Sequence, residues 1–447
     1  MARILVAGAG HGGVVCAYLL AKQGHSVILF EKSQRGETGP DQKDVIDKNT
    51  FEGTDITMPA IFTGIKNRLT LVSRGEESRP ITLPEPPEEG ILIERRAFIA
   101  FLLEKAESAG VNVIYNCTVF APVMLGSRVA GLNTSAGIFY GDLIIDSCGV
   151  NSPVRDALPE YTRVNRAIEK YDVLYTYRAY FDKREGAPLP ETLYDIILKD
   201  DGTTGFSWVV TEKDCADVLI GRFFPVKPED LKETLKGIKG DYPHIGDKLL
   251  RGGNVTPIPV CHPLGILVCD GYAAVGDSAF MTYAVKGSGI SYSIKAGILL
   301  ARAVEGDTLG QFNTETLWEY QRLFFKETGF GACRIALLKN VLPYFTADEI
   351  RELFNSDIFD AGDFNALMEN KLEMVMGTQG RTMIKEKIRL IRENVILKEK
   401  LTALAMWIGK LTVTEAYFPN KYDKRDAEKW VEKYNEFFDS IRKKDEV

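Results

Sequence analysis

Residues 3–23 read RILVAGAGHGGVVCAYLLAKQ. The apolar run before the first glycine predicts a buried strand, and the run after the last glycine predicts a helix. Between them stands G-x-G-x-x-G, in the strand, turn and helix setting that binds a dinucleotide. Gly8 permits the tight turn, Gly10 lets the backbone approach a pyrophosphate, and Gly13 lets the helix pack close to the strand.

A second apolar run, residues 26–30, predicts the next strand of the same βαβ unit, and it ends in Glu31. This acid lies 18 residues beyond Gly13, where a carboxylate can accept hydrogen bonds from a ribose hydroxyl pair. Lys32 follows it and is predicted to contact the same ligand. His11 stands at the helix start, and we expect it to be structural and not a catalyst.

The fingerprint does not separate NAD from FAD, so the choice depends on a second glycine-containing segment. An apolar strand, residues 272–275, leads into Gly276 and Asp277, and the segment continues through Gly287-Ser288-Gly289-Ile290 into a helix over 291–304. An acid at a strand end can bind a ribityl hydroxyl, and the N–H groups of a glycine-opened helix stabilise negative charge on a reduced flavin. This arrangement favours FAD.

Further motifs make the chain similar to a known family. Arg95-Arg96-Ala97-Phe98 leads into a helix, and Gly149 to Arg155 reads GVNSPVR. With the fingerprint and Gly276-Asp277, these motifs cover residues 1–325. Over that length the chain resembles the FAD-dependent family of aromatic hydroxylases and geranylgeranyl reductases, in particular the geranylgeranyl reductase-like branch. The resemblance implies that Arg95 contacts the ribityl or phosphate region, that Gly149 lies at the cofactor, and that Asp277 contacts the ribityl chain.

The chain departs from the family pattern at two positions. The family has Asp-Gly where this chain has Cys148-Gly149, so a carboxylate that helps to hold FAD and the nicotinamide donor is missing. The family also has a proline three residues ahead of Gly-x-Gly, where this chain has Ala284. We predict that Cys148 is a small buried hydrophobe and not a redox-active thiol.

These motifs predict an α/β fold: a doubly wound, Rossmann-like FAD-binding domain with an inserted antiparallel-sheet substrate domain and a C-terminal helical region. Strand-like runs within residues 171–224 predict the inserted sheet, and helical periodicity dominates after residue 310. The predicted boundaries are 1–165 for the first part of the FAD-binding domain (with a β-hairpin excursion near 60–90), 166–255 for the substrate domain, 256–310 for the second part of the FAD-binding domain, and 311–447 for the helical domain.

The inserted sheet is expected to form the substrate wall opposite the flavin. One of its segments looks like the Tyr-x-Trp-x-Phe-Pro element of geranylgeranyl reductases, with Phe206 and Trp208 matching and the last two positions replaced. We predict both aromatic residues as members of the catalytic site, with simple core packing as the alternative. Tyr283, Lys286 or a tyrosine such as Tyr177 could deliver a proton, and Lys286 could stabilise the anionic reduced flavin.

The predicted function is that of an FAD-dependent oxidoreductase. The favoured version is a reductase that transfers hydride between flavin N5 and an apolar unsaturated small molecule, with NAD(P)H as electron donor. The alternative is a flavin-dependent monooxygenase that hydroxylates an aromatic substrate through a C4a-hydroperoxide. A non-catalytic flavoprotein is disfavoured by the inserted sheet and the intact Gly276-Asp277 pair.

Net charge and the pattern of cysteines and histidines restrict the partners that the protein is expected to bind. A net charge of −7 without a basic block gives no field to attract nucleic acid. The seven cysteines form no C-x-x-C pair and the four histidines are dispersed, which predicts no metal site and a cytoplasmic protein with reduced thiols. An apolar stripe within the helix predicted over 385–410 could pack on its own protein, close the substrate pocket, form a homodimer or make a peripheral membrane contact.

Overall fold

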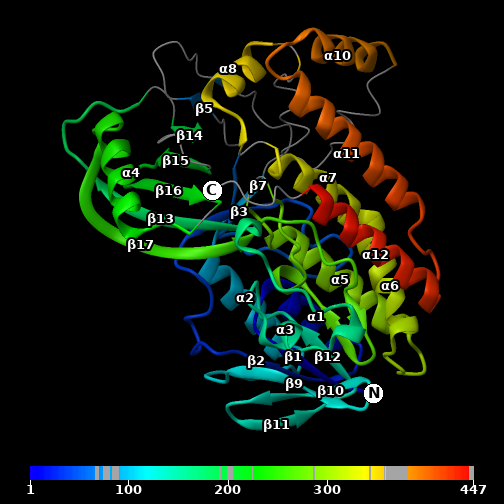
Figure 1. Ribbon diagram of the computed structural model, residues 1–447. Coiled ribbons are helices and arrows are strands. Elements are labelled where there is room, and N and C mark those ends of the chain that lie inside the picture. The colour runs from blue at the N-terminus through cyan, green and yellow to red at the C-terminus, as the bar shows by residue number, and fades with distance from the viewer. Residues whose placement is uncertain are drawn as a thin grey trace.

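The computed structural model describes residues 1–65, 70–73, 81–82, 90–190, 193–198, 205–223, 225–284, 287–341, 344–356, 358 and 381–441. Lys286, one of the predicted catalytic residues, lies outside these ranges. The described chain forms a mostly parallel sheet with its helices, a large sheet beside it, and a row of C-terminal helices along one flank (Figure 1).

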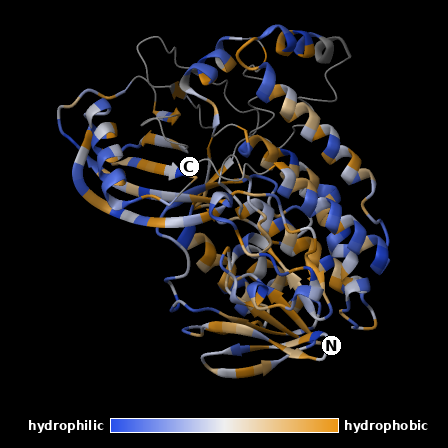
Figure 2. Ribbon diagram, viewed as in Figure 1, coloured by the Kyte–Doolittle hydropathy of each residue, from blue (hydrophilic) through white to orange (hydrophobic). Residues whose placement is uncertain are grey.

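A six-stranded sheet in the order β18-β19-β12-β1-β2-β8 forms the centre of the first region. Every neighbouring pair is parallel except β18 with β19. Its strands are β1 (Arg3–Ala7), β2 (Ser26–Phe30), β8 (Asn112–Ile114), β12 (Leu143–Asp146), β18 (Val268–Cys269) and β19 (Tyr272–Ala274). Helices α1 (His11–Lys22), α2 (Arg95–Ser108) and α5 (Ile290–Gly306) share one apolar core with these strands. The strands are apolar along their length because they are covered on both sides, and Figure 2 shows them as hydrophobic.

Two small antiparallel sheets flank this core. One contains β9 (Val119–Leu125), β10 (Arg128–Thr134) and β11 (Gly137–Tyr140). The other contains β3 (Lys43–Asp47), β4 (Thr63–Ile65) and β7 (Gly90–Glu94). The second sheet lies between the parallel sheet and the large sheet, and its strand β3 becomes important at the site.

The large sheet has the order β17-β13-β16-β15-β14-β5-β6 and is antiparallel except where β14 pairs with β5. Its strands are β5 (Thr70–Ser73), β6 (Ile81–Thr82), β13 (Val173–Lys183), β14 (Tyr194–Leu198), β15 (Gly205–Thr211), β16 (Ala216–Arg222) and β17 (Ile245–Pro259). Helix α4 (Pro228–Asp241) packs on one face. The predicted domain boundary at residue 255 remains a prediction, although β17 continues to Pro259, and the excursion near 60–90 supplies β5 and β6 to this sheet.

The C-terminal region is helical. Its helices are α6 (Thr314–Phe324), α7 (Phe330–Lys339), α8 (Ala347–Asn355), α10 (Arg381–Glu393), α11 (Lys398–Ala416) and α12 (Lys424–Ile441), with a π-helical turn at Phe325–Gly329. An aromatic cluster including Phe325, Phe418 and Trp430 joins α12 to the core. The Tyr434 hydroxyl donates a 2.8 Å hydrogen bond to the Pro263 carbonyl and fixes α12 against the first region. This arrangement confirms the predicted fold class.

The single helix predicted over 385–410 is wrong. Helix α10 ends at Glu393, and α11 begins at Lys398. Asn394 causes the break because its side-chain oxygen accepts from the N–H groups of Ile396 (3.1 Å) and Leu397 (2.8 Å), which competes with helix continuation. Among the described residues, no helix combines the length and apolar character needed to cross a bilayer.

Candidate active site

A cavity of about 440 Å³ lies at the carboxyl ends of the parallel strands and extends to the large sheet at Thr256, Pro257 and Ile258 of β17. Both glycine-containing segments line it. Of the residues predicted to bind the cofactor, the following line this cavity: Gly8, Gly10, Glu31, Lys32, Arg95, Gly149, Asp277, Gly287, Gly289 and Ile290. Segments more than 250 positions apart in the sequence therefore meet at one site.

Gly13 and Gly276, the other two predicted contacts, lie behind the cavity wall. A Cβ atom at Gly13 would lie 2.6 Å from the Cβ of Ser147, and one at Gly276 would lie 2.5 Å from the Oγ of Ser293. Both glycines allow close packing of one segment on another, which is the role predicted for Gly13. A contact of either glycine with the cofactor stays a prediction.

The fingerprint turn itself is tightly enclosed. Gly8 has φ +83°, and a Cβ there would lie 2.6 Å from the carbonyl oxygen of Ser147. A Cβ at Gly10 would lie 2.3 Å from the Ser147 Oγ. Helix α1 therefore starts against the end of β12, and its first N–H groups lie at the cavity.

Glu31 is buried and its carboxylate helps to shape this end of the cavity. One oxygen accepts a 2.9 Å hydrogen bond from the N–H of Ala9, and the other accepts a 2.8 Å bond from the N–H of Ser33. These bonds leave lone pairs of both oxygens for a ligand hydroxyl pair. The predicted contact between Glu31 and a ribose stays a prediction that this geometry permits.

The opposite end of the cavity is built by the second glycine-containing segment. The Asp277 carboxyl accepts a 3.0 Å hydrogen bond from Thr282, and burial raises the pKa of Asp277. The N–H of Gly287 donates to the Tyr283 carbonyl at 2.8 Å, and φ at Gly287 is +65°. The turn thus needs glycine at position 287 and presents the start of α5 to the cavity.

Two contacts that sequence reasoning missed hold the ends of the cavity together. The N–H of Gly12 donates a 3.0 Å hydrogen bond to Ser293 Oγ, which joins α1 to α5. Arg155, fully buried, donates to the carbonyl oxygens of Ser278 (3.0 Å) and Val150 (2.7 Å). Arg155 does not line the cavity; it ties the GVNSPVR motif to Ser278 of the second glycine-containing segment.

Polar atoms on the cavity wall test whether a flavin dinucleotide fits. His11 Nε2, Thr38 Oγ1 and Arg95 Nε are buried and have no hydrogen-bond partner among the described residues. Buried polar groups are normally paired, so these three match a ligand rich in hydroxyl, phosphate and ring-nitrogen groups. Burial is the main cause that lowers the pKa of His11 to about 3, and the positive charge of Arg95 also lowers it. The His11 ring is therefore neutral at pH 7.

Cys148 stands at the cavity where the family has an acid. Its backbone N–H donates a 3.0 Å hydrogen bond to Asp146, whose carboxylate also accepts from Ser152 and Tyr272. Burial, with Asp146 beside it, raises the pKa of the Cys148 thiol well above its usual range. A raised pKa keeps the thiol protonated at neutral pH, and the structural role of Cys148 stays a prediction.

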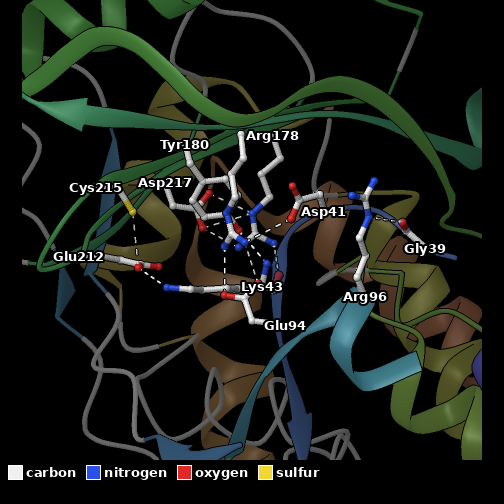
Figure 3. Close-up of polar contacts among 11 residues, drawn as sticks. Gly39, Asp41, Lys43, Glu94, Arg96, Arg178, Tyr180, Glu212, Cys215 and Asp217 are labelled. Carbon is white, nitrogen blue, oxygen red and sulfur yellow. Dashed lines mark hydrogen bonds and ion pairs between the residues drawn. The ribbon is translucent and has the colours of Figure 1, made fainter. Parts of the chain in front are cut away.

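A group of charged side chains joins the large sheet to strand β3 (Figure 3). The N–H of Lys43 donates a 2.9 Å hydrogen bond to the Tyr180 hydroxyl, and Arg178 donates a 2.6 Å bond to the Lys43 carbonyl. Arg178 is held by Asp217 through a 3.0 Å bond, and Asp217 is almost fully buried. The next residue, Asp44, lines the cavity and pairs with Arg95. This clamp of Arg178, Asp217 and Tyr180 fixes the large sheet relative to the cofactor end.

The residues predicted on the substrate side divide between the two faces of the large sheet. Phe206 packs with Tyr283 in an apolar cluster that also contains Ile258 of the cavity wall. The Trp208 ring lies 6.4 Å from that of Phe206. The suggestion that Tyr177 delivers a proton is wrong, because its side chain packs in the cluster under α4 on the opposite face. The described residues contain no group of three or more His, Cys, Asp and Glu side chains suited to a metal.

Comparisons with known proteins agree with this architecture. A family model described as an NAD(P)-binding Rossmann-like domain matches residues 6–40. A digeranylgeranylglycerophospholipid reductase of Sulfolobus acidocaldarius is 20% identical over 413 residues, which cover 88% of this chain and 90% of its own. A solved geranylgeranyl bacteriochlorophyll reductase-like protein from Thermoplasma acidophilum superposes with a TM-score of 0.70 at 20% identity, over 90% of this chain and 99% of its own.

The similar solved structures also include the alternative class, the flavin-dependent monooxygenases. PqsL of Pseudomonas aeruginosa, described as a probable FAD-dependent monooxygenase, superposes with a TM-score of 0.56 at 18% identity, over 79% of this chain and all of its own (100%). The likeness to PqsL shows the shared fold. The resemblance to geranylgeranyl reductases that the motifs indicated is confirmed by the relatives, and the fold is that of FAD-dependent oxidoreductases.

Proposed function

We propose that the chain is an FAD-dependent reductase that transfers hydride between the flavin and an apolar, unsaturated small molecule. One observation carries the proposal: a single cavity is lined by both glycine-containing segments and ends at Ile258, which belongs to an apolar cluster with Phe206 and Tyr283. The dinucleotide end and the substrate end are therefore continuous. FAD, when bound, would supply the hydride chemistry at N5.

In this proposal the chain's own residues bind and orient the cofactor and enclose the substrate. The N-terminus of α1 and the turn at Gly10 would hold the pyrophosphate, Glu31 the adenosine ribose, and Asp277 and Arg95 the ribityl region. The start of α5, which lines the cavity, would offer its N–H groups to the part of a reduced flavin that carries negative charge. The apolar cluster beyond Ile258 would exclude water from the substrate. Lys286 remains a proposed charge-stabilising residue that lies outside the described residues.

The reductase and the monooxygenase alternative differ in what they do with oxygen. Purified protein is reduced anaerobically and mixed with an apolar alkene or an aromatic substrate, first without and then with O₂. A reductase saturates its substrate without O₂, and the flavin is reoxidised as the substrate is consumed. A hydroxylated product that requires O₂ would overturn the reductase and support the alternative.

We also propose NAD(P)H as the electron donor. The resemblance to the FAD-dependent family, in which a nicotinamide nucleotide donates the electrons, supports it. The sequence contains no second G-x-G-x-x-G, so the donor would bind without a separate nicotinamide domain. Anaerobic mixing with NADH and with NADPH, followed by loss of the oxidised-flavin absorbance, tests the donor. Reduction by neither nucleotide, with full reduction by dithionite, would contradict it.

A peripheral contact with an anionic membrane is a further part of the proposal. Ile388, Val395 and Ile396, at the corner where α10 meets α11, are 44%, 92% and 51% exposed. Residues 385–398 contain five basic and two acidic residues in a chain whose net charge is −7. Exposed apolar side chains among basic residues match the interfacial region of an anionic bilayer, although Arg389 is already paired with Glu386 and Glu393. Figure 1 shows α10 at one extremity of the molecule.

Co-sedimentation with vesicles tests this contact. Binding to vesicles of phosphatidylcholine with 30% phosphatidylglycerol is expected, and it should fall about fivefold in the Val395→Ser/Ile396→Ser variant. Leu309→Ser, at an exposed leucine far from this corner in the sequence, is the matched control. Equal binding of both variants, or equal binding to uncharged vesicles, would contradict the proposal. A cytoplasmic location and a homodimer remain predictions.

A further inference from the structure

Helix α1 presents the side chain of its first residue, His11, to the cofactor cavity. Residues 8–11 line the cavity, whereas Gly12 and Gly13, the next two residues of the helix, do not. The His11 ring stacks on Phe98 of α2, with the ring centroids 5.7 Å apart and the planes inclined by 26°. His11 is therefore held between the first turns of two helices, at the wall where the dinucleotide fingerprint meets its ligand.

The start of α1 has one backbone donor fewer for an anion than a free helix N-terminus offers. The first N–H groups of a helix have no partner within the helix and can bind phosphate oxygens. Here the Gly12 N–H already donates a 3.0 Å hydrogen bond to Ser293 Oγ of α5. A Cβ at Gly12 would lie 2.1 Å from the Ser293 carbonyl oxygen, so this residue faces α5 at close range. A pyrophosphate at this helix start thus loses one backbone donor, which the side chain of His11 can replace.

Three polar atoms around the first turn of α2 are buried without a hydrogen-bond partner among the described residues. They are His11 Nε2, Thr38 Oγ1 and Arg95 Nε, and all three residues line the cavity. Thr38 is 8% exposed, and a Cβ at the next residue, Gly39, would lie 3.8 Å from Ile99 of α2. Buried polar atoms are normally paired, so a ligand with several oxygen atoms is expected to complete them.

The charged residues near His11 indicate which part of FAD lies beside it. On one side, Glu31, which is predicted to bind the adenosine ribose, accepts a hydrogen bond from the N–H of Ala9. On the other side, Arg95 is near enough to both His11 and Asp277 for its positive charge to act on them, and Asp277 is predicted to bind the ribityl chain. The pyrophosphate joins these two parts of FAD, so His11 lies at the pyrophosphate position.

We propose that His11 binds the pyrophosphate of FAD, with its Nε2–H donating a hydrogen bond to a phosphate oxygen. The inference rests on the proposed function, because it takes FAD as the cofactor. It adds a binding role for a side chain at a position that the G-x-G-x-x-G fingerprint leaves open. Burial, and after it the charge of Arg95, lower the pKa of His11 to about 3, so the ring supplies a donor without a positive charge. Since an ionised phosphate oxygen accepts and does not donate, the ring must carry its proton on Nε2.

Two substitutions of His11 in the FAD-loaded protein test the inference. His11→Phe keeps a ring that can stack on Phe98 but removes both nitrogen atoms, whereas His11→Gln keeps an amide N–H donor. His25→Phe is the control, because His25 accepts from the N–H of Ala2 and does not line the cavity. Equilibrium dialysis of the holoprotein measures the dissociation constant of FAD, and ³¹P NMR of the bound cofactor reports the surroundings of each phosphate.

His11→Phe is expected to weaken FAD binding about 10- to 100-fold, because a hydrogen bond to a charged acceptor is lost. It should also shift at least one phosphorus resonance. The dissociation constant of His11→Gln should stay within about threefold of the wild-type value, and His25→Phe should change neither the affinity nor the spectrum. Unchanged affinity in His11→Phe, unchanged phosphorus resonances, or equal weakening by the Phe and Gln substitutions would overturn the inference.

A measurement on the wild type covers the case in which His11→Phe does not fold. In holoprotein labelled with ¹⁵N-histidine, the ring nitrogens of His11 are assigned by their absence from the spectrum of His11→Gln. The inference requires the ring proton on Nε2, and a proton on Nδ1 alone would overturn it. Failure of either test leaves an FAD-dependent reductase intact, whereas a wild-type chain that takes up no FAD would remove the proposed function itself.

Discussion

The two ends of the cavity are built from different chemical groups, namely backbone at the cofactor end and side chains at the substrate end. At the cofactor end the wall is mainly backbone: glycines at 8 and 10, the N-terminus of α1, and the turn before α5. At the substrate end the wall is formed by side chains of β17, such as Ile258, and Phe206 packs beside the same apolar cluster as Ile258. Backbone sites require particular residues in a fixed order, whereas side-chain sites accept many residues.

Each end also has polar groups that the protein engages and polar groups that it leaves for a ligand. At the cofactor end, Glu31 is bonded to two backbone N–H groups and Ser293 holds the start of α1, whereas His11 Nε2, Thr38 Oγ1 and Arg95 Nε have no partner among the described residues. Near the apolar cluster, the indole N–H of Trp208 has no partner among the described residues. The cofactor end is thus distinguished by its backbone framework. Four substitutions test this contrast, from the largest expected effect to the smallest.

Gly10→Val should abolish retention of FAD, with a loss of affinity of at least about 100-fold. A Cβ at this position would lie 2.3 Å from Ser147 Oγ and 2.9 Å from the Ser147 carbonyl oxygen, so α1 would have to move away from β12 and from the pyrophosphate position. Flavin content after purification and titration of the apoprotein with FAD measure the effect.

The control for this prediction is Gly409→Val, because a Cβ at that helical glycine meets nothing within 4 Å. Circular dichroism shows whether each variant is folded. A folded Gly10→Val protein that purifies fully yellow would contradict the assignment of the cofactor end.

Asp217→Ala should lower the free energy of unfolding by about 2–4 kcal/mol, because it leaves the guanidinium of Arg178 without its buried counter-charge. The Asp217 side chain is 2% exposed and that of Arg178 is 13% exposed. Since Arg178 also holds the Lys43 carbonyl, the clamp between the large sheet and β3 should loosen. Urea unfolding followed by tryptophan and by flavin fluorescence measures both effects.

Removing both charges is the sharper form of this experiment. Arg178→Met/Asp217→Leu should recover at least half of the loss, because no isolated charge remains buried. Coincident flavin and tryptophan transitions with a loss below 1 kcal/mol in Asp217→Ala would show that the clamp does not join the two ends.

Much of the cofactor end could be predicted from sequence, because its wall is built by backbone turns that require particular residues. Gly8 needs a positive φ and Gly10 tolerates no Cβ, so the motif must appear as glycines at fixed spacing. The parallel strands could be predicted for a similar reason, since burial on both sides gives continuous apolar runs. Gly13 packs closely, as predicted, against Ser147, whereas Gly276 shows the limit: its glycine is explained by close packing on Ser293, a contact that the sequence does not indicate.

The substrate end and the clamp depend on long-range contacts that leave no local pattern. Nothing in the sequence around Lys43 indicates that Arg178 and Tyr180 bind its backbone, because those residues are 135 or more positions away. Tyr177 was suggested for a catalytic role, but alternation along β13 turns its side chain to the α4 face.

His11→Gln should make the holoprotein less sensitive to acid. The folded-state pKa of His11 is lowered to about 3, below the usual 6.5, so its stabilising contribution is present above pH 6.5 and is lost as the pH falls toward 3. In that window the unfolded chain binds a proton that the folded chain does not. The free energy of unfolding of the wild type should therefore fall by about 1 kcal/mol more per pH unit than that of the variant.

Unfolding in urea at pH 7.0, 6.0, 5.0 and 4.5 measures this slope, with His25→Gln as a matched control, since burial lowers the pKa of His25 as well but its ring is away from the cavity. Parallel curves for wild type and His11→Gln would show that His11 is protonated in the folded protein. That result would remove the neutral imidazole from the cofactor end.

Trp208→Phe should have the smallest effect and separates the two ends most cleanly. The ring remains to contact Phe206 and Tyr194, and the lost N–H has no partner among the described residues, so the free energy of unfolding should change by less than about 0.5 kcal/mol. FAD affinity should be unchanged because Trp208 does not line the cofactor cavity. A loss of 1–2 kcal/mol would show that the indole N–H is already satisfied within the protein, and Trp208 would then offer no donor to a ligand.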